Sequence, residues 1–366
     1  MGLALLGAHA APAQGFSPAE AVKRMTVAPG FDVKLVASEP LMAQPVCIEF
    51  DDRGRLWVVQ YLQYPNPAGL KRVKVDRYSR TVYDRVPEPP PFGPKGADRI
   101  TIMEDTNADG LTDRAHDFIS GLNLATSAVI GYGGVFVMQA PYLLFYADRN
   151  GDDVPDGNPE VLLSGFGIED SQSFANNLLW GPDGWLYGCQ GSTVTAKVRG
   201  FEFQQAIWRY HPVSKRFELF TEGGGNIWGL DYDRDGNMLA SSNGGGGVPD
   251  WSIDTAPAFS GKYVNYRMIH MVQGGYYAKG WAKHGGLHNP HVYGYFDRVP
   301  GGSYKGLHVT PGGTVYLGDT FPAEFQGRYL ANDLLSHSVQ WSALEPWGTT
   351  FKSSYGGDLL VANDTW

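Results

Sequence analysis

One pattern recurs along the chain: a strand-like run, a glycine turn and a second run of aromatic or β-branched residues. Its five turn glycines are Gly54, Gly134, Gly184, Gly236 and Gly313. A glycine pair or Asp-Gly between alternating apolar residues predicts a β-hairpin, because the tight turn needs residues that tolerate positive φ. Recurrence of such a unit along the chain is typical of an array of similar supersecondary structures.

A second hairpin follows three of the five repeats. The segments expected to pair are 99–104 with 115–119, 142–146 with 160–163, and 206–210 with 217–220. Two consecutive hairpins form a four-stranded antiparallel sheet, which is one blade of a β-propeller. The sequence therefore predicts an all-β fold, a six-bladed β-propeller of four-stranded antiparallel blades over residues 17–366.

Two intervals between repeats are longer than the others, which predicts insertions at 65–96, rich in proline, and at 248–290, rich in glycine and aromatic residues. Loops of this kind usually lie on one face of the ring and build its site. A sixth turn glycine would fall beyond Trp366, so the last blade is expected to be incomplete.

The composition agrees with many short strands and excludes one class of partner. Charged residues make up 18% of the chain and aromatic residues 13%, which favours tight-turned β structure over a helical bundle. The formal net charge is −9 and no basic run occurs, whereas binding a phosphate backbone needs clustered Lys and Arg. Nucleic acid is therefore not an expected partner.

The N-terminus and the cysteines bear on the compartment. Residues 1–13 combine a short apolar run with small-x-small sites, which predicts the remnant of a secretory signal peptide rather than a floppy terminus. We therefore expect export to the periplasm or cell surface, and no apolar stretch is long enough for a transmembrane segment. Cys47 and Cys189 are expected as buried thiols, although export leaves a disulfide possible. No Cys-x-x-Cys-His occurs, so no c-type haem is expected in this chain.

Two acidic loops share one spacing of oxygen-bearing residues. Alternate residues of a tight loop converge on one point, and Ca²⁺ prefers six to eight oxygen ligands. The alternative is a solvated turn that merely favours Asp and Asn. We expect Ca²⁺ in both loops, with the ligands Asp105, Asn107, Asp109 and Asp113 in the first and Asp148, Asn150, Asp152 and Asp156 in the second.

Histidines gather between positions 270 and 308. Gly285, Gly286 and Pro290 exclude a helix that would align His284 with His288, and no carboxylate lies between them to complete a metal site. Polar loop residues near the channel mouth are the favoured interpretation. No Gly-x-Ser-x-Gly elbow or Walker loop supports acyl transfer or nucleotide hydrolysis.

Four longer strings carry a family resemblance: residues 203–212, 223–231, 288–296 and 363–366. In combination they resemble the planctomycete-type membrane-bound dehydrogenase domain, from about Ala21 onward. That family is similar to the quinoprotein glucose/sorbosone dehydrogenases, six-bladed propellers that bind pyrroloquinoline quinone (PQQ) and Ca²⁺ above the central channel. Its longer members continue into helical repeats and a cytochrome, which this sequence does not contain.

The resemblance implies site residues, and the sequence departs from it at two of them. Ser173 stands where the dehydrogenase motif has a catalytic histidine, and a serine without a partner base is too weak to take a hydroxyl proton. Gly225 replaces a quinone-binding arginine, whereas Asn226 matches the asparagine beside it. Gln190 falls where those enzymes carry a polar site residue.

Two functions remain open. The first is oxidation of a small sugar or alcohol with PQQ, with electrons passing to a cytochrome c. The base would then be His284, His288 or His308, with Glu169 and Asp170 as acidic alternatives. The second is a non-catalytic propeller that binds a glycan or a protein through amide and aromatic groups at its mouth. The residues expected to contact cofactor or ligand are Ser173, Gln190, Asn226, Trp228 and Asn243.

Overall fold

The computed structural model describes residues 15–76, 80–191, 193–243, 267–275, 277, 301–302, 312–334 and 336–364. Within these ranges the chain is built almost entirely from antiparallel sheets. Helix α1 (Pro18–Arg24) begins at Ser17, whose side chain caps the backbone N–H of Glu20, and a short 3-10 turn spans Ala323–Phe325. No helix in the described ranges is long and apolar enough to span a membrane.

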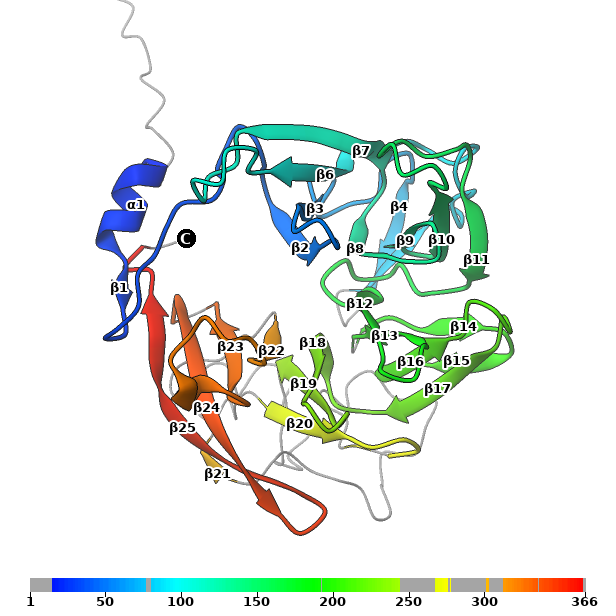
Figure 1. Ribbon diagram of the computed structural model, residues 1–366. Helices are drawn as coiled ribbons and strands as arrows, with labels where there is room; N and C mark the ends of the chain where they lie inside the picture. The colour runs from blue at the N-terminus through cyan, green and yellow to red at the C-terminus, as the bar shows by residue number, and fades with distance from the viewer. Residues whose placement is uncertain are drawn as a thin grey trace, which may run out of the picture.

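Five sheets of three or more strands surround a common centre in the described residues (Figure 1). We call them sheets 1 to 5 in chain order. Sheet 1 contains β2 (Pro45–Phe50), β3 (Leu56–Gln60), β6 (Asp98–Glu104) and β7 (Arg114–Leu122). Sheet 2 contains β8 (Ala125–Ile130), β9 (Gly134–Gln139), β10 (Tyr142–Ala147) and β11 (Glu160–Ser164). Sheet 3 contains β12 (Asn176–Trp180), β13 (Leu186–Gln190), β16 (Ala206–Tyr210) and β17 (Phe217–Glu222).

The strands of sheets 4 and 5, like those of sheets 1 to 3, are given in their order across the sheet. Sheet 4 contains β18 (Asn226–Tyr232), β19 (Met238–Asn243) and β20 (Arg267–Met271). Sheet 5 contains β22 (Gly313–Val315), β23 (Tyr329–Asp333), β24 (Ser338–Trp347) and β25 (Thr350–Val361), joined by β1 (Thr26–Val27) and β21 (Gly301–Gly302). Two small hairpins are separate from these sheets: β4 (Arg72–Val75) with β5 (Thr81–Tyr83), and β14 (Ala196–Val198) with β15 (Phe201–Phe203).

The three predicted outer hairpins are confirmed. Strands β6 and β7, β10 and β11, and β16 and β17 pair antiparallel in the expected segments. The turn glycines Gly54, Gly184 and Gly236 have φ values of 77°, 77° and 81°. The turn predicted at Gly134 is displaced by one residue: Gly133 has the positive φ, whereas Gly134 opens β9, where a Cβ would collide with the carbonyl oxygen of Tyr146.

Sheet 5 contains β22 to β25 together with β1. The six-blade count, the incomplete last blade and the bounds of the two insertions stay predictions. The insertion predicted at 65–96 contains β4 and β5, and the one at 248–290 contains β20, which completes sheet 4. The predicted signal remnant at 1–13 lies outside the described residues.

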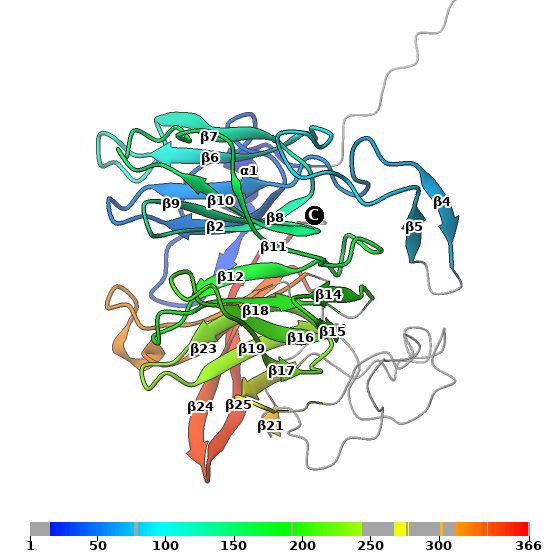
Figure 2. The same ribbon diagram turned by 90° about the vertical axis from the view of Figure 1, so that its right-hand side faces the viewer.

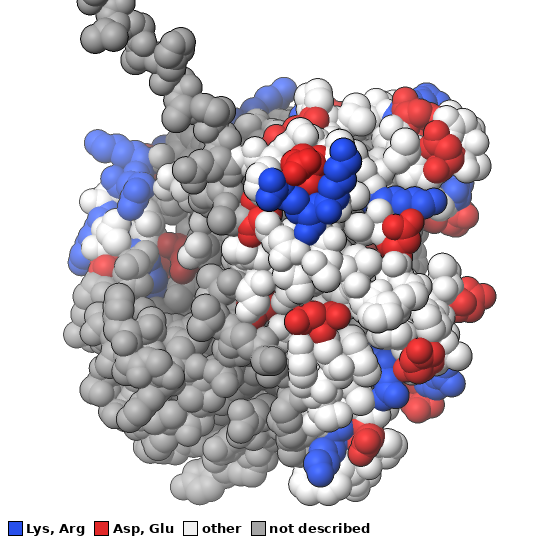
Figure 3. All heavy atoms as spheres, turned by 90° about the vertical axis from the view of Figure 1, so that its left-hand side faces the viewer, with Lys and Arg blue, Asp and Glu red and all other residues white. Residues whose placement is uncertain are grey.

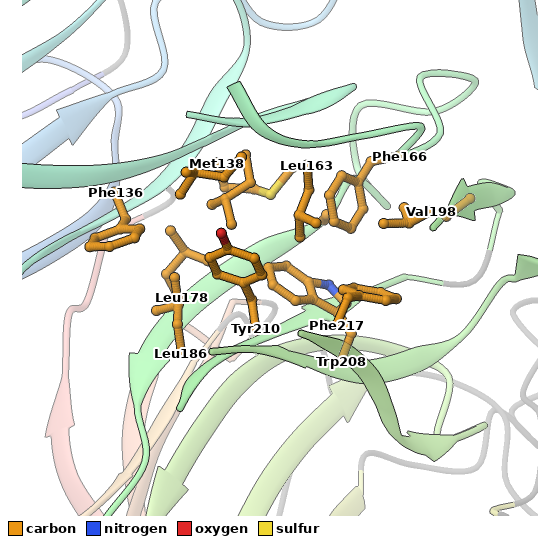
Figure 4. Close-up of a cluster of buried hydrophobic side chains, with 14 of the residues drawn as sticks. Phe136, Met138, Leu163, Phe166, Leu178, Leu186, Val198, Trp208, Tyr210 and Phe217 are labelled. Carbon is orange, nitrogen blue, oxygen red and sulfur yellow. The ribbon is translucent and has the colours of Figure 1, made fainter. Parts of the chain in front are cut away.

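The core consists of apolar layers between adjacent sheets. The layer between sheets 2 and 3 contains Phe136, Leu163, Phe166 and Trp208, and Figure 4 shows Leu163 and Phe166 facing Trp208. Every second residue of a strand contributes to such a layer, because successive side chains point to opposite faces. Both cysteines are free thiols, Cys189 buried and Cys47 half-buried.

The first strands of sheets 1 to 4 share one irregularity. In β2, β8, β12 and β18 the register with the next strand shifts near the strand's start, which is a β-bulge. In β18 the extra residue is Trp228, between the pairs Ile227–Ser242 and Gly229–Ser241. Bulges bend a strand and re-aim its side chains, and they are common at the rims of closed sheets. We therefore expect a functional site at the ends of these four strands where the bulges lie.

Candidate functional site

Residues 169–173, which we call the mouth loop, lie in the chain between β11 and β12. The loop forms hydrogen bonds to β18 of sheet 4 and to the segment that follows β3 of sheet 1. The backbone carbonyl of Gln172 accepts hydrogen bonds from Asn226 Nδ2 (3.0 Å) and from the indole N–H of Trp228 (2.9 Å). On the other side, Gln172 Nε2 donates to the hydroxyl of Tyr64 (3.0 Å). Tyr61, next to the end of β3, donates its hydroxyl to the Ser171 carbonyl (3.3 Å). The structure therefore brings the predicted residues Asn226 and Trp228 together through a backbone group that the sequence could not reveal.

The mouth loop is also fastened to sheet 3. Asp170 accepts hydrogen bonds from the backbone N–H of Gln172 (3.0 Å) and from the hydroxyl of Thr193 (2.5 Å). The carbonyl of Ser173 accepts from the N–H of Gly191 (3.0 Å), and Ser173 itself is 2% exposed. Ser173 is thus a buried part of the loop, and Asp170 is occupied in holding the loop's shape.

Two amide oxygens near Gly191 are buried without a hydrogen-bond partner in the described structure: Gln190 Oε1 and Asn226 Oδ1. Gln190 is fully buried and donates its Nε2 to the Gln204 carbonyl (3.1 Å). Asn226 Oδ1 lies against Gly191, where a Cβ would collide with it. A buried acceptor left unpaired costs about 1–3 kcal/mol, so each such oxygen calls for an explanation such as a bound water or ligand.

The equivalent positions in sheets 1 and 2 show what is unusual about Gln190. Gln60 and Gln139 also end the second strand of their sheets. Their amide oxygens accept the backbone N–H groups of Ala43 (2.8 Å) and Asn123 (2.9 Å) and so fix the entry to the inner strand. Gln190 has no such bond, which leaves an acceptor available in sheet 3 that the other two sheets use internally.

Glu169 is the second predicted acidic alternative to histidine. Its Oε1 accepts the N–H of Thr195 (3.3 Å), its Oε2 is buried without a partner in the described structure, and its backbone carbonyl accepts the N–H of Thr81 (2.8 Å). Burial raises the pKa of the Glu169 carboxyl. Of the other predicted residues, Asn243 pairs with Asn226 through the backbone, and His284, His288 and His308 lie outside the described residues.

The eight residues predicted to bind Ca²⁺ are each hydrogen-bonded to a backbone N–H of their own loop. Asp105, for example, accepts from Asp109 (3.1 Å) and Gly110 (2.7 Å), and Asp148 accepts from Asp152 and Asp153 (both 3.2 Å). In the described part of the chain, no group of three or more carboxylate, His or Cys side chains is placed to hold a metal ion. Ca²⁺ binding by both loops stays a prediction.

Asp98 is a charged residue at the same end of the sheets that sequence analysis missed. It opens β6, is fully buried, and accepts the backbone N–H groups of Gln63 (2.6 Å) and Ala125 (2.8 Å). It therefore ties the start of β8 in sheet 2 to the segment that follows β3 in sheet 1. Burial raises the pKa of Asp98 to about 6.

This pKa predicts a pH dependence of stability. A carboxyl whose pKa is higher in the folded protein binds its proton more tightly there, so folding gains free energy as the pH falls from 8 to 5. Between pH 8 and pH 5 this gain is about 1.5 kcal/mol. The stabilisation reaches its full value below the unfolded pKa and is lost as the pH rises through 6. Urea unfolding at both pH values should show this gain in the wild type and its loss in Asp98→Asn. Glu49, whose pKa burial raises to about 7, acts in the same direction, so Glu49→Gln measures its separate share. An unchanged pH profile in Asp98→Asn contradicts the assignment.

The fold resembles solved sugar dehydrogenase propellers at low sequence identity. The PQQ domain of pyranose dehydrogenase from Coprinopsis cinerea is 10% identical, with a TM-score of 0.52 over 92% of this chain and 86% of that one. The PQQ-bound aldose sugar dehydrogenase of Streptomyces coelicolor is 14% identical, with a TM-score of 0.44 over 91% and 84% of the two chains. An oxidoreductase of Thermus thermophilus described as a glucose dehydrogenase is 14% identical, with a TM-score of 0.46 over 86% and 84%.

The likeness to the pyranose dehydrogenase domain, together with the sheets around a common centre, shows the β-propeller fold, and fold alone does not carry function. No curated protein sequence matches the chain. The resemblance to planctomycete-type membrane-bound dehydrogenases stays a prediction in its planctomycete and membrane-bound details. A family model matches nearly the whole described chain, and by that match the protein belongs to the family described as domain of unknown function (DUF7133), over residues 17–366.

Proposed function

We propose that the mouth of this propeller binds a small polyhydroxylated ligand, a sugar or sugar alcohol. The observation that carries the proposal is the buried, unpartnered amide oxygen of Asn226, which lies against Gly191 and beside Trp228. The amide oxygen of Gln190, the residue before Gly191, is also buried without a partner in the described structure. An amide oxygen accepts a hydroxyl hydrogen, and an aromatic ring packs against the apolar face of a sugar ring. A hydroxyl donor at Asn226 Oδ1 removes the cost of the unpaired acceptor, which is a gain available only to a ligand or water that donates.

The described residues do not fit PQQ. The quinone carries three carboxylates, and the position where the resemblance implies a cation is Gly225. The side-chain donors Asn226 Nδ2 and Trp228 Nε1 are both bonded to the Gln172 carbonyl. Ser173 offers no base of adequate strength. No catalytic step through the quinone is derived for these residues.

Oxidation of a sugar or alcohol with PQQ is the second candidate. The likeness to the PQQ domain of pyranose dehydrogenase favours it. The base would be His284, His288 or His308, or else Glu169, whose raised pKa suits proton uptake. This candidate also predicts export to the periplasm or cell surface, Ca²⁺ in the two acidic loops and a cytochrome c as electron acceptor.

The test is a calorimetric titration of the purified protein with a panel of monosaccharides and sugar alcohols, with and without Ca²⁺. We expect millimolar binding of at least one compound and a tenfold or greater loss of affinity in Asn226→Ala and in Gln190→Leu. Trp347→Ala is the control, because this tryptophan is 58% exposed in sheet 5. Addition of PQQ and a dye acceptor in the same samples measures oxidation.

The outcomes separate the two candidates. Sugar binding without dye reduction supports the binding function, whereas dye reduction that needs PQQ establishes the dehydrogenase. Affinity that is unchanged in Asn226→Ala removes the mouth residues from the proposal, and a panel without any binding overturns it.

A further inference from the structure

The hairpin of β4 and β5 stands clear of the body of the propeller, as Figure 2 shows. All four residues of β4 are exposed, with Val73 63% and Val75 46% accessible, and Val82 of β5 is 49% accessible. Burying such side chains is favourable by about 1.5–3 kcal/mol each, so a projecting strand with exposed valines indicates a contact surface.

The insertion that carries this hairpin is basic in an acidic chain. Residues 65–96 contain seven Lys and Arg against three Asp and Glu, while the whole chain has a net charge of −9. Arg80 and Arg85 pair with Asp76 and Asp84, both on the insertion itself. Lys71, Arg72 and Lys74 form no ion pair with any described residue. Lys and Arg gather on the projecting part of the molecule at the upper left of Figure 3.

The hairpin is held in place by bonds at its base. Asn123 exchanges two hydrogen bonds with Ala68 (2.8 and 3.2 Å), and the hydroxyl of Tyr142 donates to the Pro87 carbonyl (2.6 Å). The N–H of Thr81 donates to the carbonyl of Glu169 in the mouth loop (2.8 Å). A surface fixed in this way loses little conformational entropy when a partner binds.

Strand β4 has one unpaired edge. Within the described residues it pairs only with β5, so its other backbone N–H and C=O groups are open to a further strand. The register of β4 with β5 shifts between Arg72 and Lys74, so that Arg72 lies opposite Tyr83 and Lys74 lies opposite Val82. Each face of the hairpin therefore carries one basic side chain and one exposed valine, Arg72 with Val75 and Lys74 with Val82. We propose that β4 is a docking edge for an extended, acidic and aliphatic segment of a partner protein, which adds as a third strand.

The open backbone edge of β4 and its exposed basic and valine side chains together favour a peptide strand over other anionic partners. An incoming strand with acidic and aliphatic residues would meet the exposed basic side chains, the exposed valines and the backbone donors together. An anionic polysaccharide or lipid headgroup would use the charges and leave the strand edge unpaired. The inference is independent of sugar binding, because Arg72 and Lys74 take no part in the mouth.

The test uses a fluorescein-labelled peptide of four Glu-Val repeats and measures its anisotropy with the purified protein. We expect saturable binding that weakens with salt and is at least tenfold weaker in Arg72→Glu/Lys74→Glu. Lys23→Glu on helix α1 is the matched control and should leave binding unchanged. The same peptide with methylated backbone amides should not bind, because it cannot form the strand ladder.

Three results would overturn the proposal: no peptide binding, equal binding of the methylated peptide, or equal binding by the double variant. Attachment to vesicles containing phosphatidylglycerol without peptide binding would assign the basic edge to a lipid surface instead. Folding of the variants is checked by their sugar binding or, where none is measurable, by their thermal unfolding.

Discussion

Arg55→Met is expected to lower the free energy of unfolding by about 3–5 kcal/mol, because it leaves buried carboxylates without their cation. The Arg55 side chain is 12% exposed and bonds to Asp51 (2.7 Å), Glu104 (3.1 Å) and both oxygens of Asp153 (2.6 and 2.8 Å). Asp153 belongs to the acidic loop of sheet 2, so this one guanidinium joins sheets 1 and 2. Urea unfolding at pH 7 measures the loss.

The pH dependence gives the same prediction a second readout. Hydrogen bonds from Arg55 lower the pKa of Asp153, so their contribution is present above the ordinary value of 3.8 and is lost as the pH falls through the folded pKa below it. In Arg55→Met the carboxyls lose this partner, and the variant's deficit should shrink between pH 7 and pH 4.5 as they take up protons.

Arg53→Met is the matched control for this pair of measurements. Arg53 lies two residues away, and its guanidinium makes only a long contact with the Gly151 carbonyl (3.5 Å) among the described residues. We expect a loss of less than about 0.5 kcal/mol there. Equal losses in both variants would show that the buried network does not hold the two sheets together.

Trp208→Ala should cost about 3–5 kcal/mol through the cavity it leaves between sheets 2 and 3. Trp208 is fully buried, with its ring centroid 5.1 Å from that of Phe166 and 6.1 Å from that of Phe217. The indole also covers Gly188, where a Cβ would collide with the ring. Gly188→Ala alone should therefore cost about 1–3 kcal/mol by overpacking.

A double-mutant cycle tests whether this contact is the cause. In Gly188→Ala/Trp208→Ala the new methyl group meets a cavity, so the combined loss should be at least 1 kcal/mol smaller than the sum of the single losses. Trp347→Ala, which removes an exposed tryptophan, serves as the reference for an effect without a cavity. Additive losses in the cycle would exclude the steric contact as the reason for glycine at 188.

The hairpins could be predicted because their signals are local. Asp-Gly turns at 184 and 236 need only their own residues to adopt positive φ, and both do so. The strand β20 was missed because its flanking sequence is rich in glycine and aromatic residues and its partner among the described strands, β19, begins 29 residues earlier. Pairing over such a separation is decided by the sheet and not by the strand's own pattern.

The site could be predicted only in part. Asn226 and Ser173 were identified by resemblance, and Trp228 was predicted as an aromatic group at the mouth. Asn226 and Trp228 do meet at the mouth loop. The acceptor that joins them is the carbonyl of Gln172, and a backbone carbonyl is present in every residue and has no sequence signal. The unpartnered state of Gln190 Oε1 is likewise invisible, since Gln60 and Gln139 look the same in sequence and are satisfied.

The sequence by itself determined the outer hairpins, the glycine turns at 54, 184 and 236 and the propeller class, because these depend on side-chain alternation and on φ preferences within a few residues. Only the tertiary structure decided that Arg55 meets Asp153, 98 residues away, and that the Gln172 carbonyl receives two side chains from another sheet. Such contacts arise when radial sheets bring distant loops to one end of the molecule, where closeness is set by packing and not by spacing along the chain.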